Sequence, residues 1–140
     1  MLVFAIDFDG TLVEHRFPKV GPAVPRAFEW LRRLQALGAR LILLTMRSDG
    51  RADGTNPLRD AVTFCRQYGI EFWQVNENTE QDAWTSSRKV YAHRYVDDAA
   101  VGCPLVPHPD GGTPVVDWSV VGPLLEAELV ARRRELGEGN

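Results

Sequence analysis

Two carboxylates stand close together near the start of the chain. Asp7 and Asp9 follow the apolar residues FAI, with one Phe between them, and Gly10 and Thr11 come directly afterwards. Side chains alternate in direction along a β-strand, so positions two apart share a side. We therefore expect Asp7 and Asp9 to face the same place, at the point where a strand ends.

Other polar residues stand where apolar runs end. Thr45 closes the run ARLILLT, and Asp97 and Asp98 follow HRYV. The carboxyl ends of parallel strands meet along one rim of a sheet, and open α/β sheets bind their ligands there. Four carboxylates at one rim repel each other strongly unless a cation is bound. Oxygen ligands without His or Cys favour a hard ion, and Mg²⁺, which is usually shared with a phosphate, fits best.

The rest of the pattern predicts a sheet that positions these residues, because strand and helix periods alternate along the chain. The expected strands are 2–8, 39–45, 70–75 and 93–96, and the expected helices are 24–37, 57–68 and 123–136. Residues 10–22 are polar and contain Gly and Pro, which is typical of a loop. We predict an α/β fold, a three-layer Rossmann-like parallel sheet with helices on both faces.

Two of the helices carry specific signals. Asn56 and Pro57 are typical of the N-cap and the first position of the second helix. In the last helix, Glu128 is placed to pair with Arg132 on the solvated side. The apolar stripe that should dock this helix on the body of the protein comprises Leu125, Leu129 and Leu136.

Composition restricts the class of protein. The 140 residues suit one domain, 1–140, because domains typically contain about 100–150 residues. The net charge of −3 gives no general attraction to nucleic acid or to an anionic membrane, and no apolar run is long enough to cross a bilayer. No signal peptide is visible, so we expect a cytoplasmic protein in which Cys65 and Cys103 are inert core thiols.

Four segments resemble the motifs of the haloacid dehalogenase-like superfamily. DFDGTLV, residues 7–13, is similar to the first motif, D-x-D-G-T-L, and Thr45 after its hydrophobic strand matches the second motif. Lys89, eight residues before Asp97, resembles the Lys of the third motif, although Arg88 stands beside it. YVDD, ending at Asp98, resembles the paired Asp of the fourth motif, and the match spans residues 4–98 in the family's order.

The resemblance implies a chemical role for each motif residue. Asp7 would be the nucleophile that attacks phosphorus to form an aspartyl-phosphate. Asp9 would protonate the leaving oxygen and then take a proton from the hydrolytic water. Thr45 would hydrogen-bond a phosphoryl oxygen, while Lys89 would neutralise charge there and hold Asp7 ionised. The residues that the resemblance places around the phosphate are Gly10, Thr45, Met46, Arg47 and Lys89.

Mg²⁺ is the cofactor that the resemblance implies. Its ligands would be the Asp7 carboxylate, the backbone carbonyl of Asp9 and the two acids of the fourth motif. Asp98 is the one expected to bind directly, with Asp97 acting through water. An acid at position 9 also points to a phosphatase or phosphotransferase, because dehalogenase and phosphonatase members have no acid there.

The length of the loops predicts how the site is covered. Cap domains of the superfamily are inserted after the first motif or before the third, and here both intervals are short, so no cap domain is expected. A homo-oligomer or a large substrate would then have to cover the site, with the oligomer favoured over a nucleic-acid end because of the net charge of −3. The substrate is a phosphorylated compound that the sequence does not identify.

Other readings of the same residues stay open. The enzyme could be a phosphotransferase or a phosphatase of nucleic-acid ends, or the chain a non-catalytic module that binds phosphate. A receiver domain is disfavoured because the third strand ends in VNEN, without Asp. Arg47, Arg51 and His15 are either a basic cluster that faces the substrate or exposed loop residues, and the second is expected.

Overall fold

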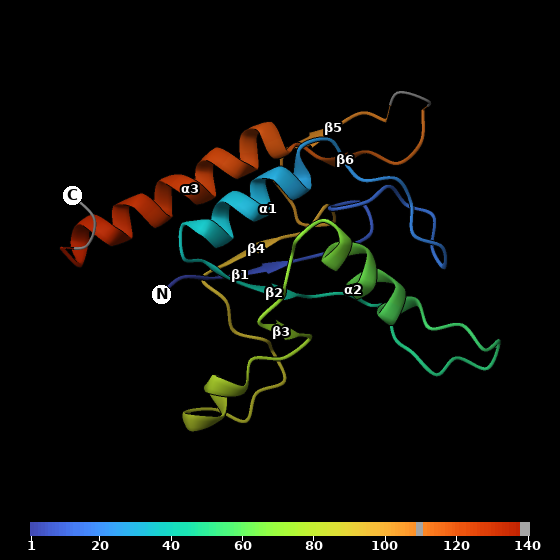
Figure 1. Cartoon of the computed structure of the whole chain (residues 1–140), viewed down its shortest axis with the longest axis horizontal. Coiled ribbons are helices and arrows are strands. Elements are labelled where there is room, and N and C mark those ends of the chain that lie inside the picture. The colour runs from blue at the N-terminus through green and yellow to red at the C-terminus, as the bar shows by residue number, and fades with distance from the viewer. Residues whose placement is uncertain (109–110, 138–140) are drawn as a thin grey trace.

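The computed structural model describes residues 1–108 and 111–137 (Figure 1). Its central sheet has four parallel strands in the order β3-β2-β1-β4. The strands are β1 (Val3–Ile6), β2 (Arg40–Leu43), β3 (Gln74–Val75) and β4 (Arg94–Val96). Each is shorter than the apolar run that predicted it, and the loss is greatest in 70–75, where only the last two residues pair with β2. This is a mixed α/β, Rossmann-like sheet flanked by helices.

The long helices share one face of this sheet. Helices α1 (Ala27–Ala36), α2 (Pro57–Gln67) and α3 (Trp118–Glu135) contribute to one core with the even-numbered side chains of β1, Phe4 and Ile6. The odd-numbered Val3 and Ala5 pack with Ala92 on the opposite face. Within the described residues that face has only the connection from β3 to β4, which contains the short 3₁₀ helix η1 (Thr79–Ala83). Figure 1 shows α1 and α3 on one side of the sheet and η1 on the other. The prediction of helices on both faces therefore holds only in part, because the second face carries a short 3₁₀ helix and no long helix in the described residues.

Two helices begin differently from their sequence signals. Helix α2 starts at Pro57 as predicted, but its N-terminal amides are capped by Asp49, whose Oδ1 accepts from the amides of Leu58 and Arg59 at 3.0 Å. Asn56 instead accepts a hydrogen bond from the Gly50 amide. Asn56 therefore occupies the predicted N-cap position, but its side chain does not cap the helix.

Helix α3 starts at Trp118, and its N-cap is Asp117, whose carboxylate accepts from the Ser119 amide at 3.1 Å. The start predicted at 123 was wrong, since Pro123 lies inside the helix. The docking of α3 on α1 is close: a Cβ added at Gly122 would lie 2.1 Å from the Trp30 ring. No helix in the described part of the chain is long and apolar enough to cross a membrane.

The outer side of α3 also differs from expectation. Glu128 pairs with Arg94 of β4, at 2.7 Å, and not with Arg132. Leu125 and Leu129 are buried as predicted, whereas Leu136, at the end of the helix, is exposed. Contact with the sheet edge thus replaces the pairing along the helix that the spacing predicted.

A short antiparallel pair, β5 (Leu105–Val106) and β6 (Val115–Val116), was not predicted. It lies beside the loop 10–22, which we call the flap. The amide of Val116 donates to the Gly10 carbonyl at 3.0 Å, and the indole N–H of Trp118 donates to the Thr11 carbonyl at 2.8 Å. The β5–β6 pair therefore supports the base of the flap.

Candidate active site

Three carboxylates converge at the ends of β1 and β4. Oxygen atoms of Asp7, Asp97 and Asp98 lie within 4.8 Å of one another. We call these residues the acid cluster. The strands that carry them are neighbours, and the amide of Asp7 donates to the Val96 carbonyl at 2.9 Å. All three side chains are half-buried, so the rim rule for parallel sheets located this cluster correctly.

Thr11 holds Asp7 and Asp98 of the acid cluster in place through two hydrogen bonds. It is completely buried, and its hydroxyl donates to Asp7 Oδ2 at 2.9 Å while accepting from the amide of Asp98 at 3.2 Å. One hydroxyl thus joins the first and fourth motifs. Thr11 was expected only as part of the first motif, although its place directly after Asp-Gly at a strand end was a signal for this role.

The acid cluster brings three carboxylates together, and this environment shifts the pKa of Asp7. Burial raises the pKa of Asp7 to about 8; the hydrogen bond from Thr11 opposes this, and the neighbouring Asp97 and Asp98 add to it. A bound divalent cation would reverse the effect, because it favours the ionised carboxylate. The donor set contains three carboxylates and no His or Cys. It therefore fits a hard ion such as Mg²⁺.

Gly10 has a steric reason to be glycine. Its φ of +83° lies in the left-handed region, and an added Cβ would be 2.2 Å from both Asp98 Oδ2 and His15 Nε2. These two atoms are 2.8 Å apart, in a hydrogen bond between the flap and the acid cluster. The side chains of Asp98 and His15 therefore fill the space that a side chain at position 10 would need.

Asp9 does not belong to the acid cluster. Both of its carboxylate oxygens are bound by the guanidinium of Arg47, each at 2.8 Å. The prediction that Asp7 and Asp9 face the same place is therefore wrong for their side chains in this structure. The physical reason is that β1 ends at Ile6, so the alternation of a strand no longer controls position 9.

Arg47 is buried, with 2% of its surface exposed, so the expectation of an exposed loop residue is also wrong. Besides Asp9, it donates to the carbonyls of Pro18, Lys19 and Pro57 at 2.8–3.2 Å. A guanidinium has five N–H groups. All five are used inside the protein, which leaves Arg47 no donor for a phosphate in this arrangement.

The second motif lies next to Arg47. Thr45 is half-buried; its hydroxyl accepts from the Arg47 amide at 3.2 Å, and its own amide donates to Asn76 Oδ1 at 2.8 Å. Met46 is almost fully exposed, at 98%. Asn76, which was not predicted as a site residue, follows β3 in a left-handed conformation with φ of 54° and orients the end of β2.

The structure does not bring Lys89 to the acid cluster. Its side chain is exposed, and its ammonium lies 5.7 Å from the centre of the Tyr95 ring. Among the described residues no ion pair joins Lys89 or Arg88 to an acid. The backbone here is held by Gln81, whose side-chain amide donates to the carbonyls of Ser87 and Lys89. The third-motif role of Lys89 remains a prediction.

Cys65 is a core thiol as expected, whereas Cys103 is only partly buried. Cys65 is buried in the core of α2, and burial raises the pKa of its thiol to about 12. Burial also raises the pKa of the partly buried Cys103. Neither thiol is therefore activated as a nucleophile.

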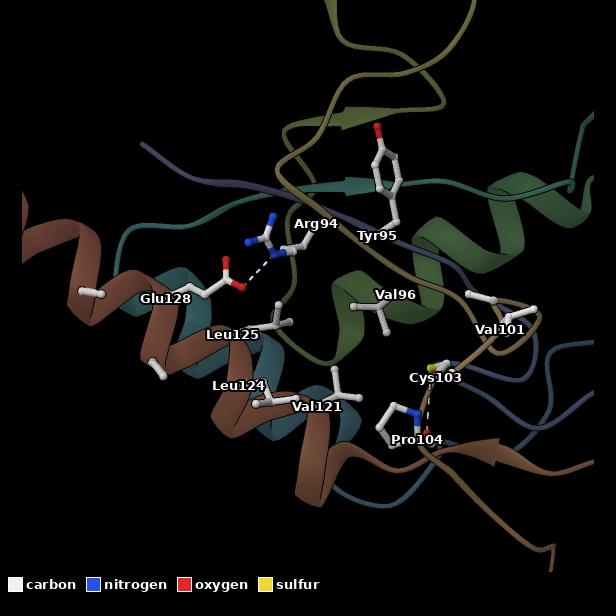
Figure 2. A pocket seen from close by; sticks show the side chains of 14 residues that line it. Arg94, Tyr95, Val96, Val101, Cys103, Pro104, Val121, Leu124, Leu125 and Glu128 are labelled. Atoms are coloured by element: carbon white, nitrogen blue, oxygen red, sulfur yellow. Dashed lines mark hydrogen bonds and ion pairs between the residues drawn. The ribbon is translucent and has the colours of Figure 1, made fainter.

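A separate apolar pocket of about 630 Å³ lies along β4, the outer strand of the sheet (Figure 2). Its walls include Val96, Val101, Pro104, Val121 and Leu124. Figure 2 shows the Arg94–Glu128 ion pair at one end and Cys103 and Pro104 at the other. The pocket lacks the converging carboxylates of the rim, and it is a different surface from the candidate active site.

Comparison with known proteins gives one informative result. No family model matches the chain, and no curated protein matches it. The chain is similar to the solved structure of a conserved protein from Bacteroides thetaiotaomicron, with 34% sequence identity and a TM-score of 0.70. The match covers 91% of this chain and 91% of that one. The chain therefore belongs to the same family as this conserved protein.

Proposed function

We propose that the chain is a Mg²⁺-dependent phosphoester hydrolase of the haloacid dehalogenase-like type. The observation that supports this most is the convergence of Asp7, Asp97 and Asp98 within 4.8 Å at the carboxyl ends of neighbouring parallel strands. The resemblance of residues 7–13 to the first motif of the superfamily adds the nucleophile.

In this proposal Asp7 attacks phosphorus. The new bond joins Asp7 to phosphorus, and the bond from phosphorus to the leaving oxygen breaks with its electron pair going to that oxygen. Water then attacks the aspartyl-phosphate, which releases inorganic phosphate and restores the carboxylate. Thr11 orients Asp7 through its hydrogen bond. Mg²⁺ held by the acid cluster would neutralise charge on the transferred phosphoryl group.

Two further roles belong to the proposal. Thr45 hydrogen-bonds a phosphoryl oxygen from the end of β2, and Asp9 transfers a proton to the leaving oxygen. For Asp9 to do so, the carboxylate must first leave the Arg47 guanidinium, to which both of its oxygens are bound. Lys89 would have to move from its place over Tyr95 to reach the phosphate.

The proposal includes a cytoplasmic enzyme without a cap domain. The intervals in which the superfamily inserts caps are the flap, residues 10–22, and the connection from β3 to β4, and both are short. A phosphotransferase, or a phosphatase of nucleic-acid ends, is an alternative with the same residues. A module that binds phosphate without turnover is the non-enzymatic alternative.

We also propose that the chain forms a homo-oligomer through the apolar surface beside β4, which is a different surface from the rim that a second copy was expected to cover. Three apolar side chains at the β4 edge, Tyr95, Val101 and Leu124, are exposed. Arg94 and Glu128 form an ion pair at the same edge, so these two charges offset each other on this surface. Light scattering of the purified protein tests this, and Leu124→Asp should return an oligomer to monomers. A wild-type protein that is monomeric at all concentrations would contradict it.

The test of the activity is release of inorganic phosphate from p-nitrophenyl phosphate. Wild-type protein should turn over with Mg²⁺ and stop in EDTA, and Ca²⁺ should support the reaction poorly because it prefers longer bonds and more ligands. The double variant Asp97→Asn/Asp98→Asn should raise the Mg²⁺ concentration required much more than the KM for substrate. Asp82→Asn, an exposed carboxylate of η1, is the matched control and should behave as wild type. Full activity in chelator would disprove the metal's role.

A further inference from the structure

We infer that Arg47 is a positioning residue that fixes the flap and the Asp9 carboxylate in one linked arrangement. The kinetic part of this inference rests on the proposed function, whereas the conformational part does not. The residues involved come from three segments: Asp9 after β1, Pro18 and Lys19 in the flap, and Pro57 at the start of α2. A single side chain thus joins the first motif, the flap and a helix.

The contacts of Arg47 are complete. Nε and one N–H of Nη2 bind the two oxygens of Asp9, each at 2.8 Å, and the remaining three N–H groups bind backbone carbonyls. The guanidinium also lies 4.9 Å from the ring centre of Phe8 and 5.3 Å from that of Phe17. Lys offers three donors at a single point, so it cannot reproduce this planar pattern.

The tip of the flap depends on these contacts. Its side chains, residues 15–19, are exposed, while its base is held by backbone hydrogen bonds, such as those from Glu14 to Pro22 and from Val24 to Leu12. The Arg47 guanidinium donates hydrogen bonds to the carbonyls of Pro18 and Lys19 at the tip. Together with the hydrogen bond between His15 and Asp98, Arg47 therefore holds the tip against the rim.

The linkage has a consequence for catalysis. When Asp9 turns toward a leaving oxygen, Arg47 loses its only carboxylate partner among the described residues, and the guanidinium that holds the flap tip is freed to move. Movement of the tip and release of Asp9 are thus one event. Arg47 holds Asp9 at the resting position from which the carboxylate turns to the leaving oxygen. Without Arg47, both the tip and the Asp9 carboxylate would be mobile, and proton transfer to a poor leaving group would suffer most.

Limited digestion with trypsin tests the conformational part, because the flap tip contains the cleavable residues Arg16 and Lys19. Arg47→Gln should speed cleavage at the tip by about tenfold or more, since proteolysis follows the population of the open form. Asp9→Asn should speed it less, because the carboxamide retains part of the contact. Arg51→Gln is the matched control: Arg51 also lies over Phe17, at 5.1 Å, but pairs on the surface with Asp53, and its loss should leave the rate unchanged.

The kinetic part compares p-nitrophenyl phosphate with an alkyl phosphate. Arg47→Gln should lower kcat for the alkyl ester at least about tenfold more than for the activated ester, with little change in KM for either, because only the alkyl leaving group needs a well-placed acid. Arg47→Lys, the variant to use if the Gln variant does not fold, should show the same split.

Each outcome decides one part. Unchanged cleavage at the flap tip in the Arg47 variants, or an equal increase in Arg51→Gln, would overturn the inference. Equal loss of kcat for both esters would overturn the positioning of Asp9. If the wild-type protein hydrolyses no phosphoester, the proposed function fails, and the trypsin experiment still decides whether Arg47 holds the flap.

Discussion

Asp7 and Asp9 are separated by one residue and have opposite surroundings. Asp7 lies among two other carboxylates and a buried hydroxyl, and its pKa is raised to about 8, mainly by burial. Asp9 lies on a buried guanidinium that binds both of its oxygens. One side of the loop therefore gathers three carboxylates, whereas the carboxylate on the other side is paired with a guanidinium.

This difference suggests that the two sides have separate roles, with chemistry at the acid cluster and control of the flap at the Asp9–Arg47 pair. Two unit charges about 5 Å apart interact by about 3 kcal/mol at an effective dielectric constant of about 20. In the acid cluster this interaction is repulsive and creates a demand for a cation, whereas between Asp9 and Arg47 it is attractive. The first side is where we expect metal and phosphate, and the second is where we expect the flap to be controlled.

The largest expected effect removes the function of the acid cluster. Asp7→Asn should lower kcat by more than about a hundredfold, because the carboxamide is neither a nucleophile nor a good metal ligand. Phosphate release measures the rate, and circular dichroism checks that the fold is retained. If the variant kept more than about a hundredth of the wild-type kcat, catalysis through Asp7 would be refuted.

On the side of Asp9 and Arg47, the main expected effect is a loss of stability. Arg47→Met leaves the Asp9 carboxylate and three backbone carbonyls without their partner, and we expect a loss of about 3 kcal/mol in the free energy of unfolding. Urea denaturation measures it. The double variant Asp9→Asn/Arg47→Met should recover part of the loss, since no charge is then left unpaired. If the loss in the double variant equalled the sum of the losses in Asp9→Asn and Arg47→Met, the two residues would not be coupled.

The pH dependence of stability should reveal the raised pKa of Asp7. The folded pKa of Asp7, about 8, lies above the ordinary value of 3.8, so the folded protein binds a proton more tightly than the unfolded chain. The stability from this group is then complete below pH 3.8 and is lost as pH rises toward 8. In EDTA, the free energy of unfolding should fall between pH 5 and pH 8.5 by about 2–4 kcal/mol more in wild type than in Asp7→Asn.

Mg²⁺ should remove most of this difference in wild type, because the ion favours the ionised carboxylate. Urea denaturation at several pH values, with and without the ion, gives the comparison. A wild-type curve parallel to that of Asp7→Asn would mean that Asp7 is already ionised in the metal-free protein.

The smallest expected effect concerns the hydroxyl that joins two motifs. Thr11→Val keeps the shape of the side chain but removes the donor to Asp7 and the acceptor of the Asp98 amide. We expect a loss of about 1–3 kcal/mol in stability. The pKa of Asp7 should rise further, because the Thr11 hydrogen bond lowers it. Nuclear magnetic resonance titration of the Asp7 carboxyl measures this, and an unchanged titration would exclude Thr11 as an influence on Asp7.

Much of the fold was predictable because its signals are local. Alternating strand and helix periods gave the four strands and the three long helices, and the rim rule brought Asp7, Asp97 and Asp98 together. The start of α3 was placed too late, at residue 123, because Asp117 was not recognised as its N-cap.

The rest of the site depends on tertiary contacts that no local pattern contains. Arg47 lies in a polar loop, and only the folded flap supplies the carbonyls that make its burial favourable. Asp9 turned away because β1 had already ended, and the exposed Lys89 lies over Tyr95, a contact that its spacing from Asp97 does not reveal. Thr11 and Asn76 act through hydrogen bonds between segments far apart in the chain.

The most direct test of the central claim is to trap the phosphorylated protein. Wild type and Asp9→Asn would be mixed with p-nitrophenyl phosphate and Mg²⁺, quenched in acid, digested and examined by mass spectrometry. We predict one added phosphoryl group on the peptide that contains Asp7, more in Asp9→Asn because hydrolysis of its intermediate is slow, and none in Asp7→Asn or in EDTA. Phosphate release with no phosphorylated peptide, or with the phosphoryl group on another residue, would contradict the account.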